Sequence, residues 1–146
     1  MIGEFICVTR IDMTSARPLI AVVDDEEPVR RAIARLIRSE SFEVDSFASG
    51  EEFLESLQRR CPDCVVLDVH MPGLSGRDVQ RHLLQAHIRV PLIVVTAQDA
   101  PVLRQQCLAD GALGYLPKTE VAEHLMRLIR EAIESQVAAP KGSTGL

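Results

Sequence analysis

The segment VVLDVHMPGLSG, residues 65–76, places an aspartate, Asp68, between a run of apolar residues and a Pro-Gly turn. Continuous runs rich in Val and Leu are typical of strands in parallel sheets, because helices cover both faces of such strands. A carboxylate at the end of a buried strand is costly unless it has a cationic or hydrogen-bonding partner. The role of Asp68 therefore depends on which residues meet it at the end of this strand.

Four other segments have strand character. LIAVV at 19–23 and LIVVT at 92–96 are short apolar runs, like CVVLD at 64–68. FEVDSF at 42–47 alternates apolar and polar residues, which favours an edge strand, and ALGYL at 112–116 is a weaker fifth. The sequence thus predicts five strands, three of them covered on both faces.

Helical patterns separate these strands. Pro28 begins the first, and Ser75 with Asp78 predicts an N-terminal cap for the third. The fourth has a poor apolar stripe and stops near Gly111, a residue suited to a C-terminal cap. The other ranges are 50–58 for the second helix, near 76–87 for the third, near 99–109 for the fourth, and apolar positions from Val121 to Ile133 for the last. Alternating strands and helices predict an open α/β sandwich with right-handed crossovers.

Length and charge limit the function further. The chain has 146 residues, about one domain, and no apolar run approaches the ~20 residues that cross a bilayer. A net charge of −5 argues against a direct nucleic-acid surface. The first residues lack the features of a secretory signal, so we expect a cytoplasmic location. We expect a domain at 18–138, after a poorly ordered extension at 1–17 and before a tail or linker start at 139–146.

The pair CPDC at 61–64 has the spacing of a redox or zinc site. A zinc site would need a second pair, and a thioredoxin-like pair would follow a strand at the start of a helix, whereas this pair precedes a strand. We therefore expect Cys64 to be a small buried apolar residue and Cys61 to lie in a loop.

Polar residues lie where the predicted strands end. Asp24 and Asp25 follow the first strand, and Asp68 ends the third. Thr96 ends the fourth, and the fifth runs out at Lys118. Because the carboxyl ends of parallel strands emerge at one edge of a sheet, where open α/β folds bind ligands, these side chains should converge.

Three clustered aspartates need a cation. Two carboxylates ~4 Å apart repel by about 4 kcal/mol at an effective dielectric constant of ~20. No Cys or His side chain is suitably placed, and oxygen ligands favour Mg²⁺ over zinc. We expect Asp24 and Asp25 to bind Mg²⁺ and Asp68 to be the nucleophile toward a phosphoryl group. Lys118 and Thr96 would contact the phosphoryl oxygens.

Five segments together resemble the receiver domains of bacterial two-component response regulators, over about residues 18–136. They are VVDDEEPVRRAIARLI, FASGEEFL, VVLDVHMPGLSG, IVVTA and DGALGYLPK. The resemblance implies a flavodoxin-like three-layer α/β sandwich with a five-stranded parallel sheet in the order 2-1-3-4-5. It also implies a signalling phosphoacceptor with only self-phosphorylation and autodephosphorylation, not an enzyme.

For the reaction, the resemblance implies that a histidine kinase or phosphotransfer protein phosphorylates Asp68. Mg²⁺ would be held by Asp25, Asp68 and the backbone carbonyl of His70, with Asp24 helping through water. The amide of Ala97 would contact the phosphoryl group.

For the response, the resemblance implies that Thr96 and Tyr115 form a switch. The threonine hydroxyl moves to the phosphoryl group, and the aromatic ring turns inward behind it. The expected signalling face consists of the fourth helix, fifth strand and fifth helix, which is also the expected face for a phosphorylation-dependent homodimer. A C-terminal DNA-binding output domain would be the partner in a longer parent chain.

One departure from the family pattern concerns Lys118. Many receivers have proline after this lysine, whereas here Pro117 precedes it and Thr119 follows; we expect Lys118 to reach the phosphoryl oxygens nevertheless. The alternatives are an unphosphorylated docking module, a flavodoxin-like electron carrier and a phosphatase with an aspartyl nucleophile. The absence of Trp and the single Tyr speak against a flavin site, and His70 stands where such phosphatases have a second aspartate.

Overall fold

The computed structural model describes residues 17–138. Its strands are β1 (Leu19–Val23), β2 (Glu43–Phe47), β3 (Cys64–Asp68), β4 (Leu92–Thr96) and β5 (Gly114–Pro117). Its helices are α1 (Glu27–Arg38), α2 (Gly50–Ser56), α3 (Gly76–Gln85), α4 (Pro101–Ala109) and α5 (Val121–Ala138), with a short 3₁₀ helix, η1 (Lys118–Glu120), before α5. The strands form one parallel sheet in the order β2-β1-β3-β4-β5, which confirms the predicted fold class.

The three apolar runs form the centre of the sheet. Strands β1, β3 and β4 are buried along their whole length, whereas β2 lies at one edge and is only partly buried. The fifth strand begins at Gly114, two residues later than predicted. The cause is local, because the Ala112 N–H donates to the carbonyl of Cys107 and so completes the end of α4.

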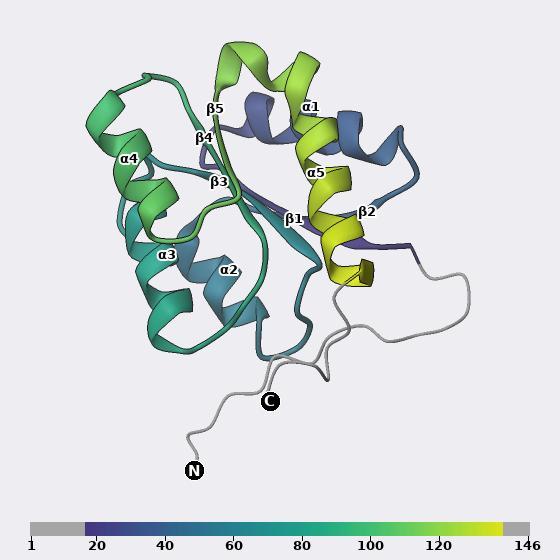
Figure 1. Cartoon of the computed structure of the whole chain (residues 1–146), viewed down its shortest axis with the longest axis horizontal. Helices are drawn as coiled ribbons and strands as arrows, with labels where there is room; N and C mark the ends of the chain where they lie inside the picture. Colours follow the sequence, from purple (N-terminus) through teal and green to yellow (C-terminus); the bar gives the residue numbers. More distant parts are fainter. Residues whose placement is uncertain (1–16, 139–146) are drawn as a thin grey trace.

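Helices cover both faces of the sheet, with α1 and α5 on one face and α2, α3 and α4 on the other (Figure 1). The alternation of side chains along each strand fills two separate cores. On the α1 and α5 side, Ile33 of α1 and Leu125 of α5 pack in the same cluster as Val66 of β3. On the other side, Phe53 of α2 and Val79 of α3 pack in the same cluster as Leu67. The three-layer sandwich is thus confirmed.

Most helix ends follow the predicted signals. Ser75 and Asp78 form a complete capping box at the start of α3. Helix α1 begins at Glu27, so Pro28 occupies its second position and not its first. Helix α4 starts at Pro101 and buries only Cys107, in agreement with its poor apolar stripe. Gly111, with φ of +104°, adopts the left-handed conformation expected after a helix end.

The predicted extension at 1–17, apart from Arg17, and the predicted tail at 139–146 lie outside the described residues. Within residues 17–138, no helix is both long enough and apolar enough to span a bilayer. Cys61 lies in the loop before β3, and Cys64 is a buried free thiol on that strand. Burial raises the pKa of the Cys64 thiol to about 12, which keeps it protonated and agrees with a core role.

Candidate functional site

The register of the sheet brings the predicted site residues to one edge. Leu67 of β3 pairs with Val23 of β1, so the residues that follow them, Asp68 and Asp24, leave the sheet at the same level. Thr96, the last residue of β4, pairs with Pro117, and Lys118 follows at once. The convergence expected from the strand ends is therefore present.

The three aspartates form a compact acidic cluster. One carboxylate oxygen from each of Asp24, Asp25 and Asp68 lies within 4.8 Å of the others. Asp24 and Asp68 are almost completely buried, at 1% and 2% exposure. Gly76 fixes the return of the chain after β3, because a Cβ there would lie 2.4 Å from the carbonyl oxygen of Asp68. Only glycine allows this close approach to the end of the strand.

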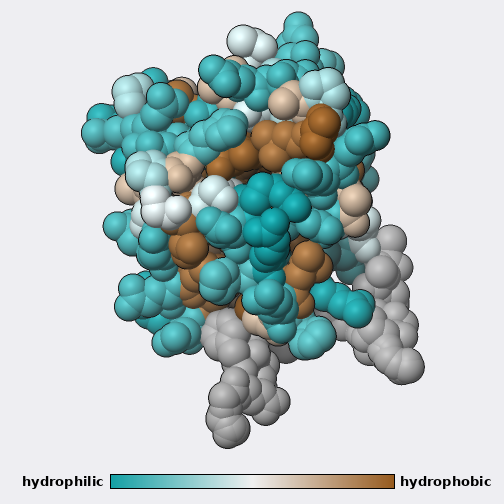
Figure 2. All heavy atoms as spheres, turned by 90° about the vertical axis from the view of Figure 1, so that its left-hand side faces the viewer, coloured by the Kyte–Doolittle hydropathy of each residue, from teal (hydrophilic) through white to brown (hydrophobic). Residues whose placement is uncertain are grey.

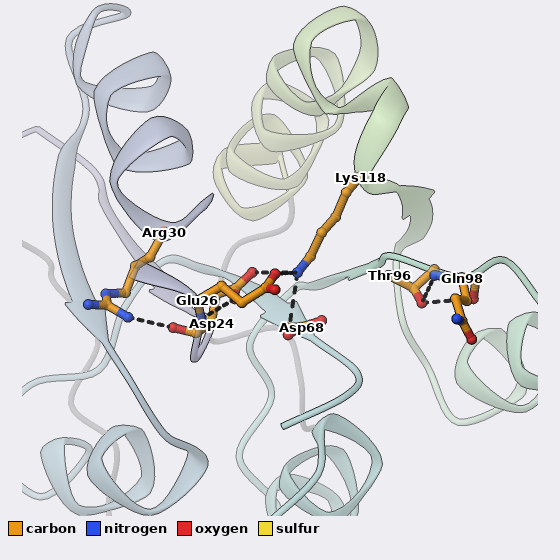
Figure 3. Close-up of polar contacts among 7 residues, drawn as sticks. All are labelled: Asp24, Glu26, Arg30, Asp68, Thr96, Gln98 and Lys118. Atoms are coloured by element: carbon orange, nitrogen blue, oxygen red, sulfur yellow. Dashed lines mark hydrogen bonds and ion pairs between the residues drawn. The ribbon is translucent and has the colours of Figure 1, made fainter. Parts of the chain in front are cut away.

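The Lys118 ammonium neutralises part of this charge (Figure 3). Its Nζ atom lies 3.0 Å from Asp24 Oδ2, 3.2 Å from Glu26 Oε1 and 3.5 Å from Asp68 Oδ2. Burial lowers the pKa of Lys118, but its close contact with the Asp24 carboxylate and the charges of Asp68 and Asp24 outweigh that effect, so the pKa is raised overall. Lys118 therefore stays charged at neutral pH.

Asp68 differs from an ordinary aspartate in its proton affinity. Burial, followed by the negative charge of Asp24, raises the pKa of Asp68 from 3.8 to about 7. The charge of Lys118 and the backbone N–H of His70 act in the opposite direction without cancelling it. A further positive charge near Asp68 would lower this pKa and make the ionised, nucleophilic form the dominant one at neutral pH.

The donor set fits a hard cation. Asp24 Oδ2 is buried and makes no hydrogen bond, although it lies 3.0 Å from the Lys118 ammonium. An ion-paired carboxylate oxygen that accepts no hydrogen bond keeps a lone pair free for a metal. Three clustered carboxylates with no sulfur or imidazole ligand suit Mg²⁺, which takes one or two carboxylates and completes its shell with water and phosphate oxygens.

Thr96 lies at the same edge but is hydrogen-bonded to its own loop. Its hydroxyl donates to the carbonyl of Gln98 at 2.9 Å and accepts from the Gln98 N–H at 3.1 Å. The side chain is fully buried, whereas Ala97 and Gln98 are exposed. The hydroxyl would have to leave Gln98 to bond a group on Asp68.

Tyr115 lies apart from the acidic cluster. Its ring is 4% exposed and packs in the core beneath α4, and its hydroxyl accepts a hydrogen bond from the Ala100 N–H at 3.4 Å. The guanidinium of Arg104 lies over the ring, 5.4 Å from its centroid. Tyr115 thus contacts the start of α4 and not Asp68.

Two contacts at the site were not predicted from the sequence. Glu26 shares the Lys118 ammonium, and Arg30 donates to the backbone carbonyl of Asp24 at 2.8 Å (Figure 3). Glu26 could have been suspected, because it continues the acidic run DDEE after β1. Nothing in the sequence distinguishes Arg30 from the other arginines of α1.

Known proteins share this pattern. A family model described as response regulator receiver domain matches residues 20–130. The response regulator protein TodT of Pseudomonas putida is 31% identical over 133 residues, which cover 90% of this chain and 59% of that protein. The response regulator MprA of Mycobacterium leprae is 39% identical over 111 residues, covering 76% of this chain and 49% of that protein. The chain spans about half to three-fifths of these relatives.

A solved structure extends the similarity to the fold. The response regulator receiver protein from Burkholderia phymatum is 42% identical, with a TM-score of 0.72, and the match covers 81% of this chain and 96% of that one. The family model covers most of the chain, and the acidic cluster formed by Asp24, Asp25 and Asp68 is consistent with a phosphoacceptor site. This chain belongs to the family of response regulator receiver domains of two-component systems.

Proposed function

We propose that Asp68 accepts a phosphoryl group from a histidine of a kinase or phosphotransfer protein, in a reaction that needs Mg²⁺. The observation that carries this proposal is the position of Asp68, buried at the end of β3, within 4.8 Å of two more carboxylates and 3.5 Å from an ammonium group. Such a cluster is unfavourable for stability alone and suited to a cation and a phosphoryl group.

The transfer is a substitution at phosphorus. An Asp68 carboxylate oxygen forms the new P–O bond, the P–N bond to the donor imidazole breaks, and the imidazole leaves with the electron pair and takes up a proton. Mg²⁺, when bound, supplies positive charge to the phosphoryl oxygens. Asp24, Asp25, Asp68 and the carbonyl of His70 are its proposed ligands, with Asp24 acting through water. The Lys118 ammonium and the Ala97 amide contact the phosphoryl oxygens.

The response is a shift between two populations that the phosphoryl group biases. Thr96 and Tyr115 connect the site to the face made by α4, β5 and α5. That face is the proposed contact for a second copy of the phosphorylated chain. Because this chain matches only about half to three-fifths of TodT and MprA, a C-terminal DNA-binding output domain in a longer parent chain is also part of the proposal.

The decisive experiment treats the protein with Mg²⁺ and acetyl phosphate, then measures the intact mass. We expect an added mass of one phosphoryl group in the native chain and in Asp45→Asn, a control that removes a carboxylate from the middle of β2. We expect none in Asp68→Asn. A mass increase that persists in Asp68→Asn, or no increase in any protein, would refute the proposal; the second result favours an unphosphorylated docking module.

Lys118 has its own test. Lys118→Ala removes the cation nearest Asp24 and Asp68, so we expect slower phosphorylation and a weaker conformational response to beryllofluoride. Arg59→Ala, an exposed cation of the loop after α2, is the matched control. Phosphorylation and response that are both unchanged in Lys118→Ala would show that the lysine does not act on the phosphoryl group.

A further inference from the structure

Arg30 of α1 is bonded through both its side chain and its backbone to the loop that follows β1. Its guanidinium donates to the backbone carbonyl of Asp24 at 2.8 Å (Figure 3). Its backbone N–H donates to the carbonyl of Glu26 at 2.9 Å. The Glu26 N–H in turn donates to Asp24 Oδ1 at 2.8 Å. The start of α1 thus holds the loop from Asp24 to Glu26, which contains the proposed metal ligand Asp25.

The Asp25 side chain has no such support of its own. Among residues 17–138, its carboxylate accepts no hydrogen bond and forms no ion pair, although one of its oxygens lies within 4.8 Å of oxygens of Asp24 and Asp68. The peptide groups on either side of Asp25 supply the Asp24 carbonyl and the Glu26 N–H, and both of these are hydrogen-bonded. Two fixed peptide planes fix φ and ψ of the residue between them, and so the direction of its side chain.

The charge of Arg30 cannot explain its position beside the cluster. A guanidinium close to a site for Mg²⁺ repels the metal ion, so the charge by itself would weaken binding. The Arg30 side chain is nevertheless half-buried, whereas the other arginines of α1 are exposed, namely Arg31, Arg35 and Arg38. The hydrogen bond to Asp24, and not the charge, is therefore what Arg30 can contribute to metal binding.

We propose that Arg30 is a positioning residue for the metal: by holding the Asp24 carbonyl, it aims the Asp25 carboxylate into the acidic cluster. This role depends on the proposed function, because it concerns Mg²⁺ bound by Asp24, Asp25 and Asp68. Removal of a group that orients a metal ligand typically weakens metal binding by roughly 10–100-fold. Because Arg30 acts through one hydrogen bond and is only half-buried, we expect a loss of about tenfold, at the lower limit.

A purely structural tie between α1 and the end of β1 is the competing explanation for this bond. Both explanations predict that loss of the bond destabilises the metal-free protein, so stability alone does not separate them. The dissociation constant for Mg²⁺ does. A structural tie leaves it unchanged, and loss of a nearby positive charge makes it smaller, whereas loss of the direction of Asp25 makes it larger.

The experiment measures the melting temperature of the protein at increasing Mg²⁺ concentration, which gives the dissociation constant. Arg30→Met and Arg30→Gln both remove the bond, the second because its side chain is shorter, so the test stands if one of them does not fold. Arg30→Lys keeps a long cationic donor. Arg35→Met is the matched control, because it removes a cation from an exposed position of the same helix.

We expect the dissociation constant to rise about tenfold in Arg30→Met and Arg30→Gln, and to stay within about twofold of the native value in Arg30→Lys and Arg35→Met. With acetyl phosphate as donor, the Mg²⁺ concentration that gives half the maximal phosphorylation rate should rise by the same factor, while the rate at saturating Mg²⁺ stays near the native rate. An unchanged or smaller dissociation constant when the bond is removed would overturn the proposal, as would an equal rise in Arg35→Met.

Asp25→Asn distinguishes failure of this role from failure of the proposed function. Mg²⁺ should stabilise the native chain and have little effect on Asp25→Asn. If Mg²⁺ stabilised both proteins equally, or neither, the metal site of the proposed function would be refuted together with the role of Arg30. If Mg²⁺ stabilised only the native chain and bound equally well to Arg30→Met, the metal site would stand and only the role of Arg30 would be refuted.

Discussion

The pKa of Asp68 is set by effects that act in opposite directions. Burial and the charge of Asp24 favour its protonated form, whereas Lys118 and the His70 amide favour the carboxylate. The protonated form prevails up to a pKa of about 7, so one ammonium does not offset two neighbouring carboxylates and the loss of water. At neutral pH about half of the Asp68 side chains are therefore protonated, and additional positive charge shifts the group toward its reactive, ionised form.

This balance predicts how stability depends on pH without divalent metal. The folded-state pKa of Asp68 is about 7 and the unfolded value is 3.8, so the folded protein holds one more proton between these limits. The contribution is fully present below pH 3.8 and is lost as the pH rises through 7, which lowers the free energy of unfolding by up to about 4 kcal/mol. Asp68→Asn should remove this slope and be more stable than the native chain at pH 8.

Urea unfolding in EDTA at pH 5, 6, 7 and 8 measures the effect. Asp45→Asn provides the control, because Asp45 lies in the middle of the edge strand, away from the cluster. A native chain whose stability does not fall across this range, or an Asp68→Asn variant with the same slope, would contradict the expected pKa.

Sequence pattern predicts some parts of the site and not others. Asp24, Asp25, Asp68 and Lys118 could be predicted together because they follow strands, and parallel strands end at one edge. The hydrogen bonds of Thr96 to Gln98 depend on a rotamer, which strand position does not determine. For the same reason, the reach of Lys118 to Asp24 could not be derived from the position of Pro117.

For helix α4, too, the apolar pattern predicts the burial of the helix but not its polar contacts with other helices. Its poor apolar stripe predicted weak anchoring, and only Cys107 is buried. The sequence did not predict that two residues of α3 hold its last turn: the Gln80 amide donates to the Cys107 carbonyl at 3.0 Å, and Arg77 pairs with Asp110 at 2.9 Å. Polar contacts between helices do not follow apolar periodicity, which explains why they were missed.

The weak burial of α4 predicts that this helix is less stable than α1, and the contacts with α3 predict that the last turn of α4 depends on Gln80. Its amides should exchange with solvent faster than those of α1, which buries Ile33, Ala34 and Ile37. Gln80→Ala should destabilise the protein by about 1 kcal/mol, because the Cys107 carbonyl loses one of its two donors and keeps only the Ala112 N–H. Gln85→Ala, at the exposed end of α3, should have little effect.

Hydrogen exchange followed by mass spectrometry tests both parts. In Gln80→Ala, the loss of protection should be largest in the last turn of α4. Equal protection of α1 and α4 in the native chain would show that α4 is as firmly anchored as α1. If the amide protection of the last turn of α4 were the same in Gln80→Ala as in the native chain, Gln80 would not stabilise that turn.

The surface over α3 and α4 contains exposed apolar side chains. Apolar side chains form bands between polar ones there (Figure 2). Among the described residues, the exposed large apolar side chains are Leu84, Val102, Leu108 and Leu113. Three of these belong to α4 or to the turn that follows it, so a weakly attached helix carries apolar surface that a shift in its position would rearrange.

The acidic cluster connects the stability of the entire sheet to Mg²⁺. Its residues lie at the carboxyl ends of β1 and β3, two central strands, so a cation bound between them stabilises the folded sheet and has no matching site in the unfolded chain. Binding at 100 times the dissociation constant adds about 2.7 kcal/mol to the free energy of unfolding. For a domain of this size, that raises the melting temperature by roughly 10 °C.

The stabilisation by Mg²⁺ should increase as the pH rises, whereas the stability of the metal-free protein should fall. Mg²⁺ binds the ionised carboxylate, so its effect should be small at pH 5 and should grow as the pH passes the Asp68 pKa of about 7. Calorimetric melting at pH 5 and pH 8, with and without Mg²⁺, measures this directly. Asp25→Asn should lose most of the gain at pH 8, whereas Asp45→Asn should keep it. If Mg²⁺ raised the melting temperature equally at both pH values, or equally in both variants, binding at this cluster could not be its cause.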